Sequence, residues 1–350
     1  MRLLGSQDRS FSPYAGIVPV LAIALLVIAV FSIRLGAVTV QFADMASALI
    51  KRFEAPNSLN ITERIFMEIR LPRALACILV GASLAIGGVL MQALFRNPIV
   101  EPGLVGTSSG AAFGASLYFV LGSVLKFHAG EWTLPIAACL GGAAATALVF
   151  LISETASPNR ESTTSLLLIG IAINALFLSG VGFLSYIARD PQARSITFWS
   201  LGTLSGANWR SVALVAAAIG IGTLIALRHA RSLNALMMGE DEALYLGVDV
   251  ARLKLTIIAV NVVIVAVATS FTGVISFVGL IVPHLLRLMR GSDNRFLLVG
   301  ALFLGAIVLT AADIVARVAL RPAELPIGIV TSAVGAPVFI ALLRGREYRF

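Results

Sequence analysis

The chain has 350 residues, of which 58% are hydrophobic and only 13% carry a charged side chain. A water-soluble domain of this length needs a polar shell, so the composition excludes the ordinary soluble globular classes. The net charge of +8 arises from 26 Lys and Arg against 18 Asp and Glu. These charged residues fall between apolar runs and not in one basic stripe, so we expect no nucleic-acid partner.

Ten apolar runs come close to the length of about 20 residues that an α-helix needs to cross a lipid bilayer. They predict an all-α, polytopic membrane protein with about ten transmembrane helices, in which residues 1–350 form a single transmembrane domain. The eighth run is short and contains Pro283, so it could instead be a re-entrant segment. In chain order the runs are 14–33, 74–95, 103–122, 134–152, 166–188, 211–227, 255–274, 275–289, 296–319 and 325–343.

The ends and loops of the runs give an orientation. The run 14–33 is too long for the core of a signal peptide and lacks a small-residue cleavage pattern, so we expect it to be retained as the first span. Lys and Arg are more frequent in the even-numbered loops and the C-terminal tail, which predicts that both termini are cytoplasmic. The connector 34–73 breaks this pattern, with six basic residues on the outer side.

The same connector contains an amphipathic stretch, FADMASALIKRF, at 42–53. Its spacing predicts a short helix that lies along the outer surface of the membrane. A loosely ordered surface loop is the alternative.

Few polar residues lie inside the apolar runs, and each is costly there. Asp313 and Arg317 are four residues apart, the spacing at which opposite charges meet on one helix face. We therefore expect a local ion pair in preference to a proton relay. Asn174 and Asn261 could either hold helices together by hydrogen bonds or line a pathway.

Glycines recur within the runs. Gly106, Gly110 and Gly114 are four residues apart, and Gly87 and Gly88 interrupt the second run. Small residues at this spacing let helix backbones approach closely in a membrane, so they predict a tightly packed bundle.

Several kinds of chemistry find little support in the sequence. The three histidines are scattered, which predicts no metal site, and both cysteines lie in apolar runs as small hydrophobic residues. No lysine follows a glycine, so the chain has no phosphate-binding loop and is not expected to be an enzyme. An ion-coupled secondary transporter would need more buried acids, and a membrane prenyltransferase would need paired Asp-rich motifs; both are weaker alternatives.

The longest polar segment on the inner side is 233–254, and it predicts two short helices. An acidic run opens the first helix, Gly247 is placed to end it, and Asp249 is a candidate N-cap for the second. Apolar residues in this segment would lie beside the membrane, which favours a partner-docking surface over a solvated loop. They are Leu244, Tyr245, Leu246 and Val248.

Five stretches resemble, in this order, the permease subunits of bacterial type II ABC importers for cobalamin, iron-siderophore complexes and haem, the FecCD-type family. They are RLPRALACILVGASLAIGGVLMQALFRNPIVEPGLVGTSSGAAFG (70–114), MGEDEALYLGV (238–248), ISFVGLIVPHLLRL (275–288), ADIVAR (312–317) and ELPIGIVTSAVGAPVFI (324–340). The resemblance implies a homodimer in the bacterial inner membrane, two ATPase subunits and a periplasmic substrate-binding protein. It also implies that ATP and Mg²⁺ bind to the ATPase subunits and that this chain holds no cofactor.

The resemblance further implies roles for individual residues. Arginines at the outer face would meet acidic residues of the binding protein: Arg70, Arg73 and Arg317. The segment 233–254 would couple to the ATPases through Met238, Gly239, Glu240, Asp241, Glu242, Leu244, Leu246 and Gly247. The cytoplasmic gate would comprise Asn97, Ile99, Thr163 and Thr164. The pathway would follow the dimer axis between the fifth and tenth runs, with Asn174 and Leu178 beside it.

The transported substrate is a finer question. The outer stretch RDPQARSITFWSLGTLSGANW at 189–209 is most similar to haem-uptake permeases, which favours haem. A large, flat and mostly apolar ligand would suit a path with few charges, although siderophore permeases are also apolar. Ferric siderophores and cobalamin are the alternatives within the same class of importer.

Overall fold

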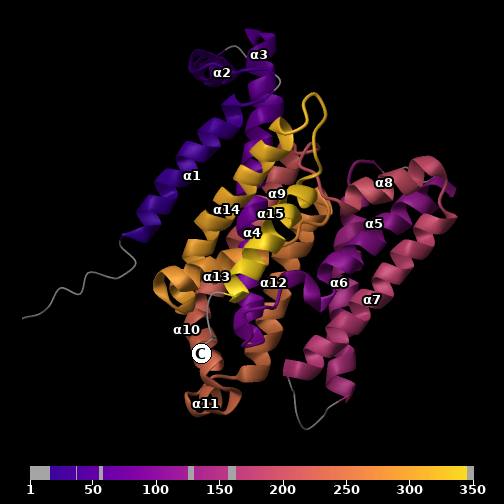
Figure 1. Cartoon of the computed structure of the whole chain (residues 1–350), viewed down its shortest axis with the longest axis vertical. Helices are drawn as coiled ribbons and strands as arrows, with labels where there is room; N and C mark the ends of the chain where they lie inside the picture. The colour runs from indigo at the N-terminus through magenta and orange to yellow at the C-terminus, as the bar shows by residue number, and fades with distance from the viewer. Residues whose placement is uncertain (1–15, 37, 55–57, 125–129, 157–162, 345–350) are drawn as a thin grey trace, which may run out of the picture.

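The computed structural model describes residues 16–36, 38–54, 58–124, 130–156 and 163–344, and no β-strand occurs in these ranges. Each of the ten apolar runs coincides with one helix, which confirms the all-α class (Figure 1). The ten helices are α1 (Ile17–Arg34), α4 (Leu71–Leu94), α5 (Thr107–Val124), α6 (Thr133–Ala156), α7 (Thr163–Ile187), α9 (Trp209–Arg228), α12 (Val250–Thr272), α13 (Val278–Arg290), α14 (Asn294–Val318) and α15 (Ile327–Arg344).

Within the described ranges, seven helices are long and apolar enough to cross a bilayer by themselves. The helix α13 is not among them. Its 13 residues extend about 20 Å at the α-helical rise, which is less than the hydrocarbon thickness of about 30 Å. A non-helical stretch at 273–277 precedes it, so α13 by itself is shorter than a full crossing requires.

The helix α4 lies at the centre of the bundle, where it packs against α9, α12, α13 and α14 (Figure 1). It approaches α13 so closely that a Cβ atom on Gly88 would lie 1.9 Å from the carbonyl oxygen of Gly279. Only glycine allows this backbone contact, and the predicted tight packing is confirmed here.

A second group of helices, α5, α6 and α7 with the short α8 (Asp190–Ser200), lies on one side of the central group (Figure 1). Cβ atoms on Gly110 and Gly114 of α5 would come within 2.3 and 2.1 Å of carbonyl oxygens on α6. Gly106 also faces α6, because a Cβ atom on it would lie 3.2 Å from the Cβ atom of Ala145. It lies before α5 with a φ of +89°, and it ends the 3₁₀-helix η3 (Pro102–Val105).

The connector 34–73 contains the predicted amphipathic helix, α2 (Phe42–Glu54). After it, α3 (Ile61–Ile65) and the π-helical turn η2 (Phe66–Arg70) continue directly into α4. The second span therefore starts at 61 and not at 74. A capping box sets this start, because Asn60 and Glu63 each accept the other's backbone N–H, at 2.8 and 2.7 Å.

Two short helices lie at the opposite end of the molecule, α10 (Ala230–Met238) and α11 (Glu240–Tyr245) (Figure 1). We call this the α11 end, and the end that carries α2 and α3 the connector end. The acidic run opens α11 as predicted, and Gly247 follows with a φ of +79°. The run opens the second of the two short helices, however, because α10 precedes α11 and was not predicted. Asp249 is an N-cap, but it caps the long span α12 and not a second short helix; its carboxylate accepts from the Arg252 N–H at 3.0 Å.

Candidate functional site

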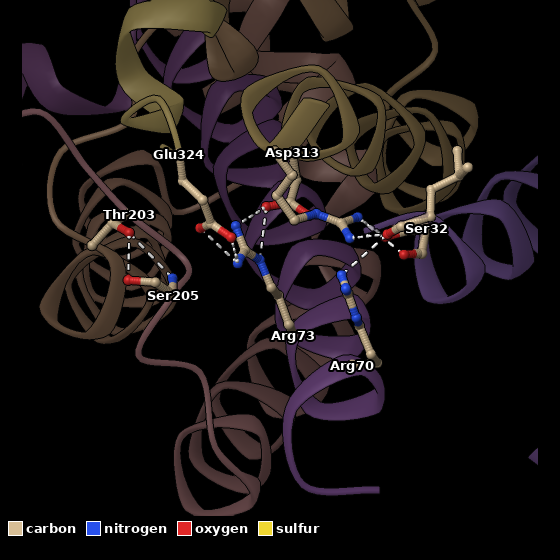
Figure 2. A network of polar contacts seen from close by, with 9 residues as sticks. Ser32, Arg70, Arg73, Thr203, Ser205, Asp313 and Glu324 are labelled. Atoms are coloured by element: carbon tan, nitrogen blue, oxygen red, sulfur yellow. Dashed lines mark hydrogen bonds and ion pairs between the residues drawn. The ribbon is translucent and has the colours of Figure 1, made fainter. Parts of the chain in front are cut away.

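A buried ion-pair cluster lies at the connector end, between α4 and α14. Asp313 accepts hydrogen bonds from Arg73 at 2.9 and 3.0 Å and from Arg317 at 2.8 Å (Figure 2). The Asp313 side chain is 1% exposed. The predicted pair of Asp313 and Arg317 is thus present, and Arg73 is its third member. A carboxylate this deeply buried needs such partners because losing its hydration shell is expensive.

The cluster also holds the end of α1. Arg317 donates to the carbonyl oxygens of Leu35 and Ser32, at 2.6 and 3.0 Å, and to the Ser32 hydroxyl at 2.9 Å. Arg70 donates to the same Leu35 carbonyl at 3.1 Å. Carbonyl groups at a helix C-terminus carry partial negative charge, so these cations stabilise the junction of α1 and α14.

The structure therefore brings the three predicted docking arginines together, but in different environments. Arg317 is buried, and its guanidinium donates to Asp313, Leu35 and Ser32. Arg73 is 11% exposed and also pairs with Glu324, at 2.9 Å, whose carboxylate is 45% exposed (Figure 2). Arg70 is half-buried. Contact with a second protein is open to Arg70 and to the outer edge of Arg73.

The α11 end differs from the connector end in its exposed apolar side chains. Four large apolar side chains are exposed there, on or beside a helix with three acidic residues in its first turn. Tyr245 is the most exposed of them, at 91%. Exposed apolar groups clustered on a polar end of a molecule mark a surface for a partner. The other three are Met238, Leu244 and Leu246.

The remaining predicted coupling residues divide between the surface and the support of α11. Asp241 and Glu242 are exposed, as is Gly247, whereas Gly239 is buried. Glu240 accepts a hydrogen bond from Lys254 of α12 at 2.8 Å. The start of α11 is thus attached to a long span.

A second attachment joins α10 to α14. Asn234 donates to the Asp293 carboxylate at 2.9 Å, and it accepts from the backbone and side-chain N–H groups of Asn294 at 2.9 and 2.8 Å. From the sequence, Asp293 can be recognised as an N-cap because it precedes an apolar run. Its contact with Asn234 on α10 cannot be predicted from the sequence.

Between the two ends, η3 connects several spans. Asn174 of α7 donates to the carbonyl oxygens of Gly103 and Leu104, at 3.2 and 2.9 Å, and accepts from the Ser109 hydroxyl at 2.5 Å. We predicted that Asn174 either holds helices together or lines a pathway. In this structure its side chain holds α7 to η3 and α5 by hydrogen bonds. Leu178, one turn further along α7, is exposed.

Asn261 on α12 is fully buried, and its amide has no hydrogen-bond partner among the residues described. It faces Gly87, on which a Cβ atom would lie 2.8 Å from the amide oxygen. The side chain therefore lies at the contact of α12 and α4.

The loop between α4 and α5 carries the first two predicted gate residues. Asn97 accepts the backbone N–H of Ile99 at 3.0 Å, and Ile99 is exposed. Thr163 and Thr164 are the first residues of α7, but their side chains lie outside the described residues.

Sequence reasoning missed Glu101 in this loop. Its carboxylate accepts the backbone N–H of Phe277 at 3.0 Å, where Phe277 has a φ of +69° just before α13. A Cβ atom on Gly335 of α15 would lie 2.6 Å from Phe277. The loop between α4 and α5 is thereby connected to α13 and α15. The only sequence signal was that Glu101 lies within one of the stretches that resemble the importer permeases.

The chain matches the model of the FecCD transport family over residues 24–345. It belongs to this family. The hemin transport system permease protein HmuU of Yersinia pestis is 40% identical over 331 residues, which cover 94% of this chain and 96% of that protein. The cobalamin import system permease protein BtuC of Halobacterium salinarum is also 40% identical, over 305 residues covering 86% and 80%.

A solved structure described as an inward-facing ABC transporter of metal-chelate type superposes on this FecCD-family chain with a TM-score of 0.83. That structure is 33% identical in sequence, and the match covers 95% of this chain and all of the other. The chain is therefore a multi-pass membrane permease of an ABC importer, and its relatives are transport proteins, not enzymes. Membership of an ABC importer family implies a partner ATPase and a binding protein, and it sets aside the ion-coupled alternative.

Proposed function

We propose that this chain is the permease subunit of a haem importer in the bacterial inner membrane. It works as a homodimer with two ATPase subunits and a periplasmic binding protein, with α11 and both termini on the cytoplasmic side. The ATPase subunits hold ATP and Mg²⁺, and this chain holds no cofactor. The observation that carries the proposal is an exposed apolar surface on α11, attached to two long spans, in a permease whose hemin-transporting relative matches it almost end to end.

Force enters at α11. The exposed side chains of α11 insert into a groove on the ATPase, and closure of the ATPase dimer on ATP moves this helix. The Glu240–Lys254 ion pair transfers the movement to α12, and the bonds of Asn234 transfer it to α14. Because α12 and α14 both pack on α4, the motion reaches the centre of the bundle.

Binding-protein docking takes place at the connector end. Arg70 and Arg73 lie at the surface of the cluster and present positive charge to acidic residues of the binding protein, which orients the encounter. Arg317 acts from behind them, because it shares Asp313 with Arg73 and so fixes the position of that guanidinium.

The pathway runs between the uncovered faces of α7 and α15 in the dimer. Leu178 and Phe183 of α7 and Val334 and Ile340 of α15 are exposed in the single chain. Apolar faces of this kind are buried by a second copy or line a path for an apolar ligand. Asn97, Ile99, Thr163 and Thr164 close the path at its cytoplasmic end.

The second candidate function is cobalamin import, because a cobalamin permease has the same 40% identity. The more complete coverage of the hemin relative, 96% against 80%, favours haem. A ferric siderophore is the third candidate substrate.

A reconstituted uptake assay tests the substrate. The permease, its ATPase and its binding protein are assembled in proteoliposomes, and ATP-dependent accumulation of hemin, cyanocobalamin and a ferric siderophore is compared. We expect accumulation of hemin only. Accumulation of cyanocobalamin without hemin would support the second candidate, and uptake without any ATPase subunit would overturn the importer mechanism itself.

A further inference from the structure

A groove with a volume of about 620 Å³ opens at the α11 end, between the start of α1, the end of α9, α10 and the start of α14. It lies on the α1 side of the bundle, whereas α7 lies on the opposite side (Figure 1). The groove is therefore separate from the proposed pathway. Its volume falls within the range of roughly 300–1,000 Å³ that is usual for small-molecule sites.

Three arginines from three different helices line this groove. Arg228 is the last residue of α9, Arg231 belongs to the first turn of α10, and Arg295 to the first turn of α14. All three are exposed. None of them forms an ion pair with a carboxylate in the described part of the chain. Three positive charges therefore face one space without a carboxylate partner in the described ranges.

The carboxylate next to the groove is already occupied. Asp293 accepts the Asn234 amide at 2.9 Å and the backbone N–H of Arg295 at 3.0 Å. Its charge is thus directed to the junction of α10 and α14. Among the described residues, no carboxylate forms an ion pair with the three guanidinium groups.

The remaining lining is apolar and belongs to spans. Val18 of α1, Leu227 of α9 and Val299 of α14 contribute to the groove. Only 11% of the residues in the apolar window of α1 are buried within the chain, so one face of this helix packs on α14 and the rest is open to lipid. Arg228 and Arg295 lie where α9 ends and α14 begins, which is the depth of the membrane–water boundary.

We propose that this groove binds an anionic diacyl phospholipid from the leaflet at the α11 end. Its phosphate lies among Arg228, Arg231 and Arg295, and the first methylene groups of its chains lie on the apolar walls. Guanidinium groups bind phosphate through paired N–H donors, and basic pockets between transmembrane helices suit anionic head groups. Only the naming of this leaflet as the cytoplasmic one rests on the proposed function.

The apolar walls of the groove favour a phospholipid over an anion without acyl chains. A free phosphate ion would satisfy the arginines but would leave Leu227 and Val299 in water. Isolated arginines at a membrane surface also extend toward lipid head groups without forming a site. In this structure three arginines from separate helices line the same groove, and this convergence distinguishes a site from isolated surface arginines. A bound lipid would also connect α1 to α10 and α14, beside the proposed coupling segment.

Native mass spectrometry of the assembled permease–ATPase complex tests the site. Binding of a phosphatidylglycerol is compared with binding of a phosphatidylcholine of the same chains, in the absence of ATP and substrate. The test variant carries Arg228→Gln, Arg231→Gln and Arg295→Gln. The control variant removes three other exposed arginines at the same end, Arg252, Arg290 and Arg344, in the same way.

We expect tight binding of phosphatidylglycerol to the unaltered complex and to the control variant. The test variant should bind it roughly a hundredfold more weakly, since each basic residue near an anionic membrane surface contributes roughly fivefold. Filling the groove with Val299→Trp should also weaken binding, although it changes no charge. Inorganic phosphate at millimolar concentration should displace none of the lipid.

Three results would overturn the proposal. Equal loss of lipid in test and control variants would indicate general surface attraction. Displacement by inorganic phosphate would indicate an anion site without acyl-chain contacts. Loss of the ATPase subunits from the test variant with lipid binding intact would assign the arginines to the ATPase interface. Because the assay uses neither substrate nor transport, failure of haem uptake would leave its outcome unaffected.

Discussion

Asp313 shows how a single residue can organise one end of a membrane protein. Its carboxylate is shared by Arg73 from α4 and Arg317 from α14, and Arg317 in turn holds the end of α1. Three spans therefore meet through one buried charge. The two cations that surround it compensate its desolvation.

Neutralising this carboxylate should destabilise the fold. Asp313→Asn leaves the buried Arg317 without a counter-charge and leaves Arg73 with only the half-exposed Glu324, and breaking a buried pair in this way costs about 3–5 kcal/mol. Thermal unfolding of the detergent-solubilised chain, followed by a thiol-reactive dye that reaches the buried Cys77, should shift to lower temperature. The control Glu324→Gln, at the exposed edge of the same cluster, should cost about 1 kcal/mol or less. Equal shifts in the two variants would contradict this account.

Arg70 gives the sharper test of docking at the connector end. Replacing Arg73 or Arg317 with glutamate would also place a second negative charge beside Asp313. Weaker docking by those variants could then come from lost surface charge or from a disturbed cluster. Arg70→Glu changes the surface charge without removing a partner of Asp313.

We expect Arg70→Glu to slow association of the binding protein and to reduce its dependence on salt, because charged surfaces steer encounter. Surface plasmon resonance at low and high ionic strength measures both effects. Basal ATPase activity of the complex should be unchanged. The same reversal at Arg64, which is exposed on α3, serves as the control. Equal effects at the two positions would remove Arg70 from the docking surface.

At the scale of elements, α11 differs from the spans because it is too short to cross a bilayer and begins with three acidic residues, yet it exposes large apolar side chains. Only Ala243 of this helix is buried. The helix is held at its start by Lys254, and α10 before it is held by Asn294. An element with a fixed base and an exposed apolar surface is well placed to receive force from another protein.

Truncating the most exposed side chain of this element should weaken assembly with the ATPase. Buried aromatic residues at interfaces commonly contribute about 2 kcal/mol or more, so Tyr245→Ala should weaken ATPase binding roughly 30-fold. Co-purification and titration of the two subunits measure the effect. Ile61→Ala is the matched control, because Ile61 is 80% exposed at the connector end. Undiminished binding by Tyr245→Ala would mean that the ATPase docks elsewhere.

At the scale of the whole molecule, the two ends carry opposite kinds of surface. The connector end holds a rigid, largely buried cluster of charges with Arg70 and Glu324 toward its edge, and the α11 end presents apolar groups together with arginines that have no carboxylate partner among the described residues. The lipid-crossing helices between them separate the proposed binding-protein surface from the proposed ATPase surface. This polarity gives the molecule a direction across the membrane.

Cysteine labelling tests that direction. In spheroplasts, Tyr245→Cys should react with a membrane-impermeant thiol reagent only after the membrane is opened, whereas Ile61→Cys should react at once. Cys77 is buried and should stay silent, and replacing Cys139 with alanine removes the other native thiol. Labelling of Tyr245→Cys in intact spheroplasts would place α11 outside and contradict the proposed orientation.

The sequence by itself determined the features that depend on neighbouring residues. Ten apolar runs predicted ten helices, the four-residue spacing predicted the pair of Asp313 and Arg317, and Asp249 was a readable N-cap. These features follow from helix period, span length and capping, which are local properties of a chain. Even so, the start of the second span at 61 was missed, because its helix extends through a polar stretch.

Only the tertiary structure decided which distant residues meet. Arg73 lies 240 residues from Asp313, and Glu101 lies 176 residues from Phe277. The packing of α9, α10 and α14 brings Arg228, Arg231 and Arg295 to one groove. Such contacts depend on how helices cross and rotate against one another, and the hydrophobic period of a span in lipid contains little information about that rotation.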